Sequence, residues 1–274
     1  MIAKEGNRRF LLGTMISRNL DKAKKAWIQR DGQASREAHD AGGGEPHRKG
    51  GGTHIKSFVY GGLDGTITTF AVVAGVAGAS LSSNVILILG FANLIADGIA
   101  MAFGDFLSTR AERQYHASER SREEWELENY PDGEKRELRE IYMEKGLSEE
   151  DAEVFVDILA KHPEVMIDTM MVEELGILEE DESPAMSGLV TFLSFVFFGF
   201  IPLLVFVVMH LTGIEVDGML WACVLTGLTL FGLGVAKSRF SRIRWWTAGL
   251  EMLFLGGLAA VAAFFVGKAL ESLA

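Results

Sequence analysis

The chain has 274 residues, of which 49% are hydrophobic, with a mean hydropathy of +0.20 and a net charge of −11 at pH 7. Residues 112–182 hold 24 of the 37 Asp and Glu residues but only 8 of the 26 Lys and Arg residues. Apolar runs with one concentrated acidic stretch are typical of a membrane protein with an acidic insert, and they argue against a nucleic-acid partner. The single cysteine, Cys223, excludes an intramolecular disulfide and a metal site built on several cysteines.

The first 53 residues are interpreted as a basic N-terminal segment followed by a linker. Residues 1–30 are compatible with a weakly amphipathic basic helix, a targeting segment or a disordered basic tail, and they lack the compact apolar core of a secretory signal. Residues 31–53 are rich in glycine and predict a flexible linker.

Residues 54–107 predict two transmembrane spans. The first runs over Ser57–Ser80 and the second over residues 85–107, with a short turn between them. No proline interrupts the chain from the second span to about Glu126, where the sequence has become strongly charged. We therefore expect one long helix, half in a bilayer and half in water.

Residues 108–183 predict a small acidic helical domain between the second and third spans. Helices are expected over about Glu134–Lys145, from Ser148 onward, and over about Glu164–Leu175. Ser148 is followed three residues later by an acid, which is close to a capping box, and His162-Pro163 interrupts the helical pattern.

Residues 184–274 predict three further spans, over Ser187–Leu211, Gly218–Ala236 and Trp246–Val266. The expected fold is an all-α integral membrane protein with five transmembrane helices.

The basic residues of the loops predict the orientation in the membrane. Twelve basic residues precede Ser57 and four lie in the 236–245 loop, whereas the turn at 81–84 and the loop 212–217 have none. The positive-inside rule therefore predicts a cytoplasmic N-terminus and a cytoplasmic acidic domain.

Several acidic side chains lie within or at the edges of the apolar spans. Asp97, Met101 and Asp105 recur every four residues and share one helix face. Asp64 is the only charge in the first span, and Glu251 lies near the start of the fifth. Acids inside a span are costly and indicate a functional site, although Asp64 is also compatible with a helix-packing hydrogen bond. A thioether beside carboxylates favours a borderline transition metal, although methionine also fills gaps in cores.

The insert contains a second group of candidate ligands. Glu119, Glu123 and Glu126 share one face of the long helix, and clustered carboxylates bind hard to borderline cations. Surface glutamates and core methionines are common, so none of these patterns is specific alone. Glu112, His116, His162, the pair Glu134 and Glu137, and the run Met170, Met171 and Glu174 are further candidates.

Motifs of nucleotide-driven or hydrolytic proteins are absent from the sequence. It has no phosphate-binding Gly-x4-Gly-Lys-Ser/Thr loop, no EF-hand loop and no His-Glu-x-x-His pair. The expected protein is therefore no enzyme and has no prosthetic group. Intramembrane acids without a nucleotide site favour a secondary transporter or channel that exchanges protons for a cation.

Two motifs resemble the first and second spans of the vacuolar iron transporter family. They are Tyr60–Thr66 (YGGLDGT) and Gly98–Ser108 (GIAMAFGDFLS), the latter followed by Arg110-Ala-Glu112. The resemblance covers about residues 54–270 and continues through Pro131–Glu137, Met170–Gly176, Gly199–Pro202 and the region of Glu251.

The resemblance implies a homodimeric exchanger that moves Fe²⁺, and often Mn²⁺, out of the cytoplasm against protons into a vacuole-like compartment. A bacterial inner membrane is the alternative location. The small-residue faces of the first and fifth spans are candidate dimer contacts. A Mn²⁺ or Ca²⁺ exchanger and a membrane-anchored metal-binding protein without transport remain open.

Carried over by position, Asp64 and Met101 resemble the family's intramembrane metal pathway, to which we add Asp97, Asp105 and Glu251. Relatives often place Glu or Gly at the position of Asp105. The metal-binding set that the resemblance implies for the insert is Glu112, Glu123, Glu126, Glu134, Glu137, Met170, Met171 and Glu174.

Overall fold

The computed structural model describes residues 26, 28–40, 54–178, 183–241 and 243–273, and these contain helices but no β-strand. The chain divides into two units, residues 1–52 and 53–274. Five helices of the second unit are long and apolar enough to cross a membrane: α4 (Ile55–Gly78), α5 (Ser83–Asn129), α9 (Pro184–Thr212), α10 (Gly218–Ser241) and α11 (Trp245–Leu270). The predicted all-α fold with five spans is confirmed.

The first unit contains helix α3 (Gly32–Asp40). The carboxylate of Asp31 accepts hydrogen bonds from the backbone N–H groups of Gln33 (2.9 Å) and Ala34 (3.1 Å), which caps the start of this helix. The prediction of a flexible linker is therefore wrong over these nine residues. Residues 41–53, and most of the segment for which a basic amphipathic helix was considered, lie outside the described residues.

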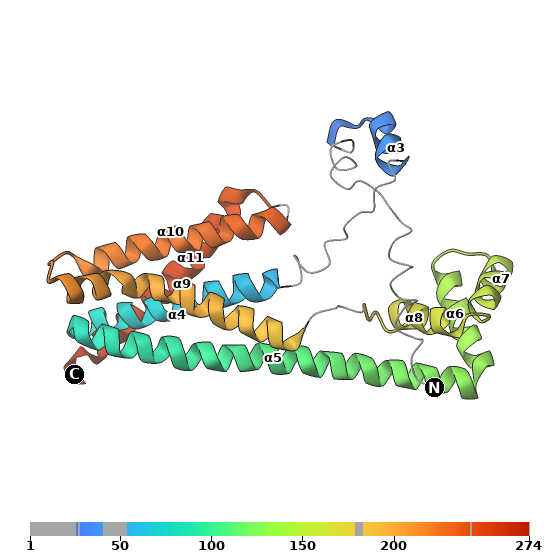
Figure 1. Cartoon of the computed structure of the whole chain (residues 1–274), viewed down its shortest axis with the longest axis horizontal. Helices are drawn as coiled ribbons and strands as arrows, with labels where there is room; N and C mark the ends of the chain where they lie inside the picture. Colours follow the sequence, from blue (N-terminus) through green and yellow to red (C-terminus); the bar gives the residue numbers. More distant parts are fainter. Residues whose placement is uncertain (1–25, 27, 41–53, 179–182, 242, 274) are drawn as a thin grey trace, which may run out of the picture. The chain divides into compact units, whose positions relative to one another are not determined.

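Figure 1 shows the five long helices side by side in one bundle, with the second half of α5 continuing beyond it. Helix α9 packs against α4, α5 and α10, and close approach of backbones makes this possible. A Cβ atom added at Gly61 would lie 2.6 Å from the carbonyl oxygen of Thr191, and one at Gly188 would lie 2.6 Å from that of Ala102. Glycine at these positions brings α4 and α5 against α9.

The first and fifth spans, α4 and α11, pack against each other within the chain. A Cβ added at Gly78 would collide with the backbone of Phe264, and one at Gly267 would collide with the backbone of Gly75. These parts of the two small-residue faces are therefore covered by the same chain, so they are not available as a dimer contact.

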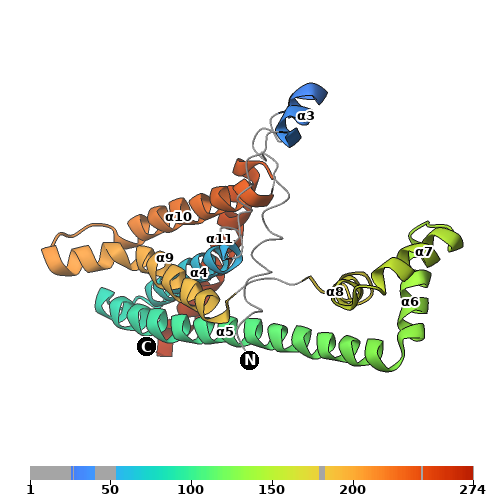
Figure 2. The same ribbon diagram turned by 45° about the vertical axis from the view of Figure 1, so that its right-hand side comes forward.

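Three short helices lie between α5 and α9 in the sequence: α6 (Pro131–Glu144), α7 (Glu149–Leu159) and α8 (Pro163–Glu173). They gather around the C-terminal end of α5 in both views (Figures 1 and 2). Ser148 caps α7 as predicted, accepting a hydrogen bond from the backbone N–H of Asp151 at 3.1 Å. Helix α6 starts at Pro131, one turn earlier than predicted, because proline is well suited to the first helical position.

Candidate metal-binding sites

Three glutamates from three helices converge at the far end of α5. Glu123 lies on α5, Glu134 in the first turn of α6, and Glu174 immediately after α8. One carboxylate oxygen of each lies within 4.8 Å of one such oxygen of the other two. Glu123 and Glu134 are only 1% and 4% exposed, whereas Glu174 is exposed. We call these three residues the acidic cluster.

The sequence reaches this geometry through the connection at Tyr130. Helix α5 ends at Asn129 and α6 begins at Pro131, so the chain reverses within a few residues and brings Glu134 back to Glu123. A Cβ at Gly133 would collide with the ring of Tyr130, so only glycine allows the ring to pack there. On the other side, Arg120 of α5 forms an ion pair with Asp168 of α8 at 2.6 Å, which helps to hold α8 against α5.

The acidic cluster lacks protein partners for two of its oxygens. Oε2 of Glu123 and Oε2 of Glu134 are buried and accept no hydrogen bond. Burial, followed by the charge of Glu174, raises the pKa of Glu123 to about 7. Burial, followed by the charge of Glu137, raises the pKa of Glu134 to about 7. Buried carboxylate oxygens without donors are costly unless a proton or a cation neutralises them, so this site is suited to a divalent cation.

One arginine partly balances the acids. Arg122 places a guanidinium nitrogen 2.8 Å from Oε1 of Glu123, 3.1 Å from Glu119 and 3.4 Å from Glu126. Arg122 contacts only Oε1 of Glu123, so Oε2 of the same carboxylate has no hydrogen-bond donor. Arg122 was not among the predicted site residues, although its position among Glu119, Glu123 and Glu126 was a usable signal.

The other predicted ligands of the insert have different surroundings: two acids interact with the acidic cluster, and two methionines are packed in apolar cores. Glu126 and Glu137 act electrostatically on both Glu123 and Glu134, so they belong to its surroundings. Met170 and Met171 are buried, one packed with Leu138 and the other packed in a separate apolar group. Within the described residues both methionines therefore contribute to the two small cores that hold α8 in place.

Within the spans, Asp64 on α4 and Asp97 on α5 are close enough to interact electrostatically. Met101, one turn after Asp97, is half-buried against the main core of the bundle. Two acids on neighbouring helices with a thioether one turn away provide oxygen and sulfur ligands for a borderline metal.

Asp105 has partners that the sequence analysis did not predict. Its Oδ2 accepts hydrogen bonds from the hydroxyls of Ser187 (2.9 Å) and Thr191 (2.5 Å) on α9. Ser187 also shares a hydrogen bond of 2.7 Å with Ser57 on α4. These four side chains join α4, α5 and α9. The available signal was the pair Ser187 and Thr191, which lie one turn apart in a mostly apolar span.

Glu251 lies apart from this polar network. Its side chain is exposed near the start of α11, and its carboxylate lies 3.6 Å from the ammonium group of Lys237 on α10. An ion pair between neighbouring spans is therefore its observed contact.

Comparison with known proteins identifies the family. The sequence matches the VIT family over residues 55–268, which is most of the chain. The chain belongs to the VIT family. The vacuolar iron transporter of Toxoplasma gondii is 41% identical over 269 residues, covering 93% of this chain and 89% of the relative. That of Plasmodium falciparum is 36% identical over 270 residues, with coverages of 94% and 98%. Vacuolar iron transporter 1 of Arabidopsis thaliana is 32% identical over 222 residues, with coverages of 80% and 87%.

Membership of the VIT family confirms the resemblance drawn from the motifs of the first two spans. It also places the chain among transporters and not among enzymes, as expected. Residues 55–268 contain both the acidic cluster and the intramembrane acids of α4 and α5.

Proposed function

We propose that this chain carries Fe²⁺ across a vacuolar or equivalent membrane, out of the cytoplasm, in exchange for protons. The proposal is supported by its VIT-family relatives, which are named vacuolar iron transporters. The observation that carries it is the acidic cluster at one end of α5, the helix that also bears Asp97 and Met101 within its apolar half. A cation transporter needs a site that binds the cation outside the membrane and ligands for it within the membrane, and α5 carries candidates for both.

In this mechanism, the acidic cluster takes Fe²⁺ from the cytoplasm and exchanges bound protons for the metal. Its unpaired oxygens on Glu123 and Glu134 supply two ligands, and Glu174 supplies a third. Fe²⁺ then moves toward the membrane and binds between Asp64, Asp97 and Met101. A proton from the acidic far side neutralises Asp64, and the metal leaves because a neutral carboxyl is a poor ligand.

The orientation follows from the loop charges. Basic residues are concentrated before Ser57 and between α10 and α11, which favours a cytoplasmic location for both and for residues 108–183. The other proposed regions are the basic segment and linker (1–53), the first two spans (54–107) and the last three spans (184–274). The proposed transporter is a homodimer, whose contact would use surfaces other than the packed faces of α4 and α11.

Two alternative functions remain: a transporter with a broader metal specificity, and a metal-binding protein that transports nothing. A broader specificity that includes Mn²⁺ fits the same ligands, because carboxylates and thioethers do not separate Fe²⁺ from Mn²⁺ by affinity order alone. A metal-binding membrane anchor without transport would bind metal at the acidic cluster and carry no flux. The intramembrane acids favour transport, because an anchor has no use for them.

The test is uptake of Fe²⁺ by liposomes that contain the purified protein, with a pH gradient imposed and the metal kept reduced. We expect uptake by the parent protein, a loss of at least tenfold in Asp64→Asn, and parental uptake in Glu215→Gln, which alters an exposed acid in the α9–α10 loop. Parental uptake by Asp64→Asn would contradict the proposed pathway. Binding of Fe²⁺ without uptake by the parent would support the anchor instead.

A further inference from the structure

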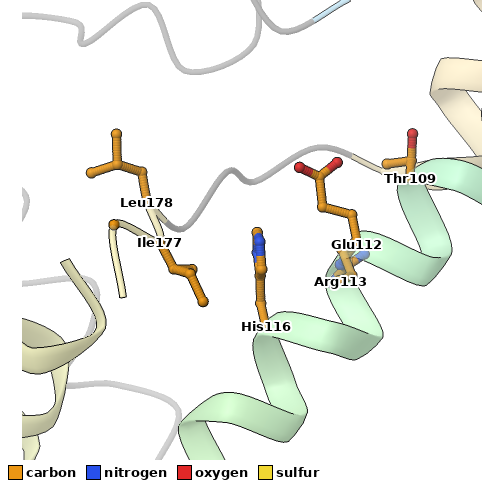
Figure 3. Close-up of a pocket in the computed structure, with 7 residues that line it drawn as sticks. Thr109, Glu112, Arg113, His116, Ile177 and Leu178 are labelled. Atoms are coloured by element: carbon orange, nitrogen blue, oxygen red, sulfur yellow. The ribbon is translucent and has the colours of Figure 1, made fainter. Parts of the chain in front are cut away.

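A cavity of about 210 Å³ lies beside α5, between the acidic cluster and the apolar half of the helix. Figure 3 shows the side chains of Glu112 and His116 pointing into it, with Ile177 and Leu178 on its other side. Glu112 is eleven residues before Glu123, which corresponds to about 16 Å along a helix, so it belongs to this cavity and not to the acidic cluster. The lining residues are Thr109, Glu112, Arg113, His116, Gly176, Ile177 and Leu178.

Glu112 and His116 have the spacing of a two-ligand metal site. Residues four apart on a helix have Cβ atoms about 5–6 Å apart, close enough for both side chains to bind one ion. A carboxylate beside an imidazole suits first-row transition metals, including iron, better than Ca²⁺ or Mg²⁺. Neither side chain forms a salt bridge with another of the described residues, so both are available to a ligand.

The cavity also lies on a continuous polar line. Asp105, Thr109, Glu112, His116, Glu119 and Glu123 follow at steps of three or four residues. At 100° per residue, all six lie within about 40° of one line along α5. His116 is seven residues from Glu123 and Glu112 is seven residues from Asp105, so each gap corresponds to about 10 Å.

Arg113 lines the same cavity and opposes a resident cation. It lies next to Glu112 in the sequence, which turns it by about 100° around the helix. Its positive charge weakens cation binding, which suits a site that must release its metal. An anion held by Arg113 and His116 is the competing occupant, but Glu112 points into the cavity and would repel it.

We propose that Glu112 and His116 form a transit site for a divalent transition metal, midway between the acidic cluster and the intramembrane acids. The inference rests on the proposed function for its direction of transfer. The site itself rests on the cavity and on the ligands that point into it.

The binding experiment uses the full chain in detergent with Co²⁺ as the probe. In a background of Glu123→Gln, Glu134→Gln and Glu174→Gln, we expect that, besides the intramembrane site, one weaker Co²⁺ site remains in the insert of each chain. Adding His116→Gln lowers its affinity at least tenfold, as is typical when a metal site loses a supporting group. Adding Ala117→His to that variant does not restore binding, because it moves the imidazole by about 100°. Glu128→Gln in the same background has no effect, because this exposed acid lies outside the cavity.

Co²⁺ binding that is indifferent to His116→Gln would overturn the proposal. So would binding of inorganic phosphate that depends on Arg113 and His116. Because three substitutions in one cluster can destabilise the insert, His116→Gln is also tested in the parent protein. There we expect Co²⁺ binding at the acidic cluster to be unchanged, and the half-saturating Fe²⁺ concentration for uptake to rise several-fold. Unchanged uptake would refute the transit role. A parent that binds Co²⁺ through His116 but moves no iron would remove the transit role together with the proposed function, and the metal site would stand.

Discussion

The acidic cluster makes the metal-free insert sensitive to pH. Glu123 and Glu134 each have a folded-state pKa of about 7, against 4.5 for the unperturbed group. Between these values the folded state binds more protons than the unfolded state. The free energy of unfolding therefore falls as pH rises from about 4.5 to 7 and stays low above that range. A divalent cation replaces the protons and restores stability at higher pH.

The size of the effect follows from the two pKa values. For one buried carboxyl, a rise from 4.5 to about 7 costs about 3 kcal/mol of stability at pH 8, or a few hundredfold in the opening equilibrium. Glu123→Gln removes one of these charges and keeps the shape. We therefore expect this variant to lose less stability between pH 5.5 and pH 8 and to respond weakly to metal.

Hydrogen exchange of the full chain is the suitable assay, because it reports on the insert separately from the membrane bundle. Peptides covering α6 and the end of α5 are compared at pH 5.5 and pH 8, with intrinsic exchange rates taken into account and with or without Co²⁺. Glu128→Gln, an exposed acid on the same helix, is the matched control and should behave as the parent does.

Two results would refute this reasoning. One is equal protection of α6 in the parent at both pH values without metal. The other is a metal response in Glu123→Gln as large as in the parent, because Oε2 of Glu123, which has no hydrogen-bond donor, would then not be a metal ligand.

Three further predictions concern the fold. Gly61→Ala should lower the thermal unfolding midpoint in detergent because its Cβ meets the carbonyl of Thr191, whereas Gly257→Ala, with no atom within 4 Å, should not. Thr191→Val removes a hydrogen-bond donor to the half-buried Asp105 and should cost about 1–3 kcal/mol, measured by unfolding in denaturant. Ser148→Ala removes the cap of α7 and should cost about 1 kcal/mol, seen as faster hydrogen exchange in the first turn of α7 alone.

The membrane architecture could be predicted from the sequence because hydropathy and helix length are local properties. The five apolar runs gave the five spans to within a few residues, and His162-Pro163 separated α7 from α8. Helix α3 was missed because the glycines around it suggested a linker, although Asp31 provides a cap. A single capping residue is a weak signal for a helix when the surrounding sequence is rich in glycine.

The geometry of the site was less accessible, because it depends on contacts between residues far apart in the chain. The convergence of Glu123 with Glu134 requires the reversal at Tyr130, and no periodicity predicts that angle. The motif resemblance named these residues but grouped Glu112 with them, although the structure gives Glu112 a separate cavity. The hydrogen bond from Thr191 to Asp105 joins two residues that are 86 positions apart in the chain, so spacing along one helix could not reveal it.

The most direct test of the proposed exchange is to measure iron and protons in the same vesicles. Liposomes containing the parent protein are loaded with a pH-sensitive dye and an Fe²⁺ indicator, with no gradient imposed, and Fe²⁺ is added outside. The account predicts that inward iron movement drives protons outward, and that Asp64→Asn abolishes both signals together. Iron uptake with no counter-movement of protons would contradict the proposed exchange.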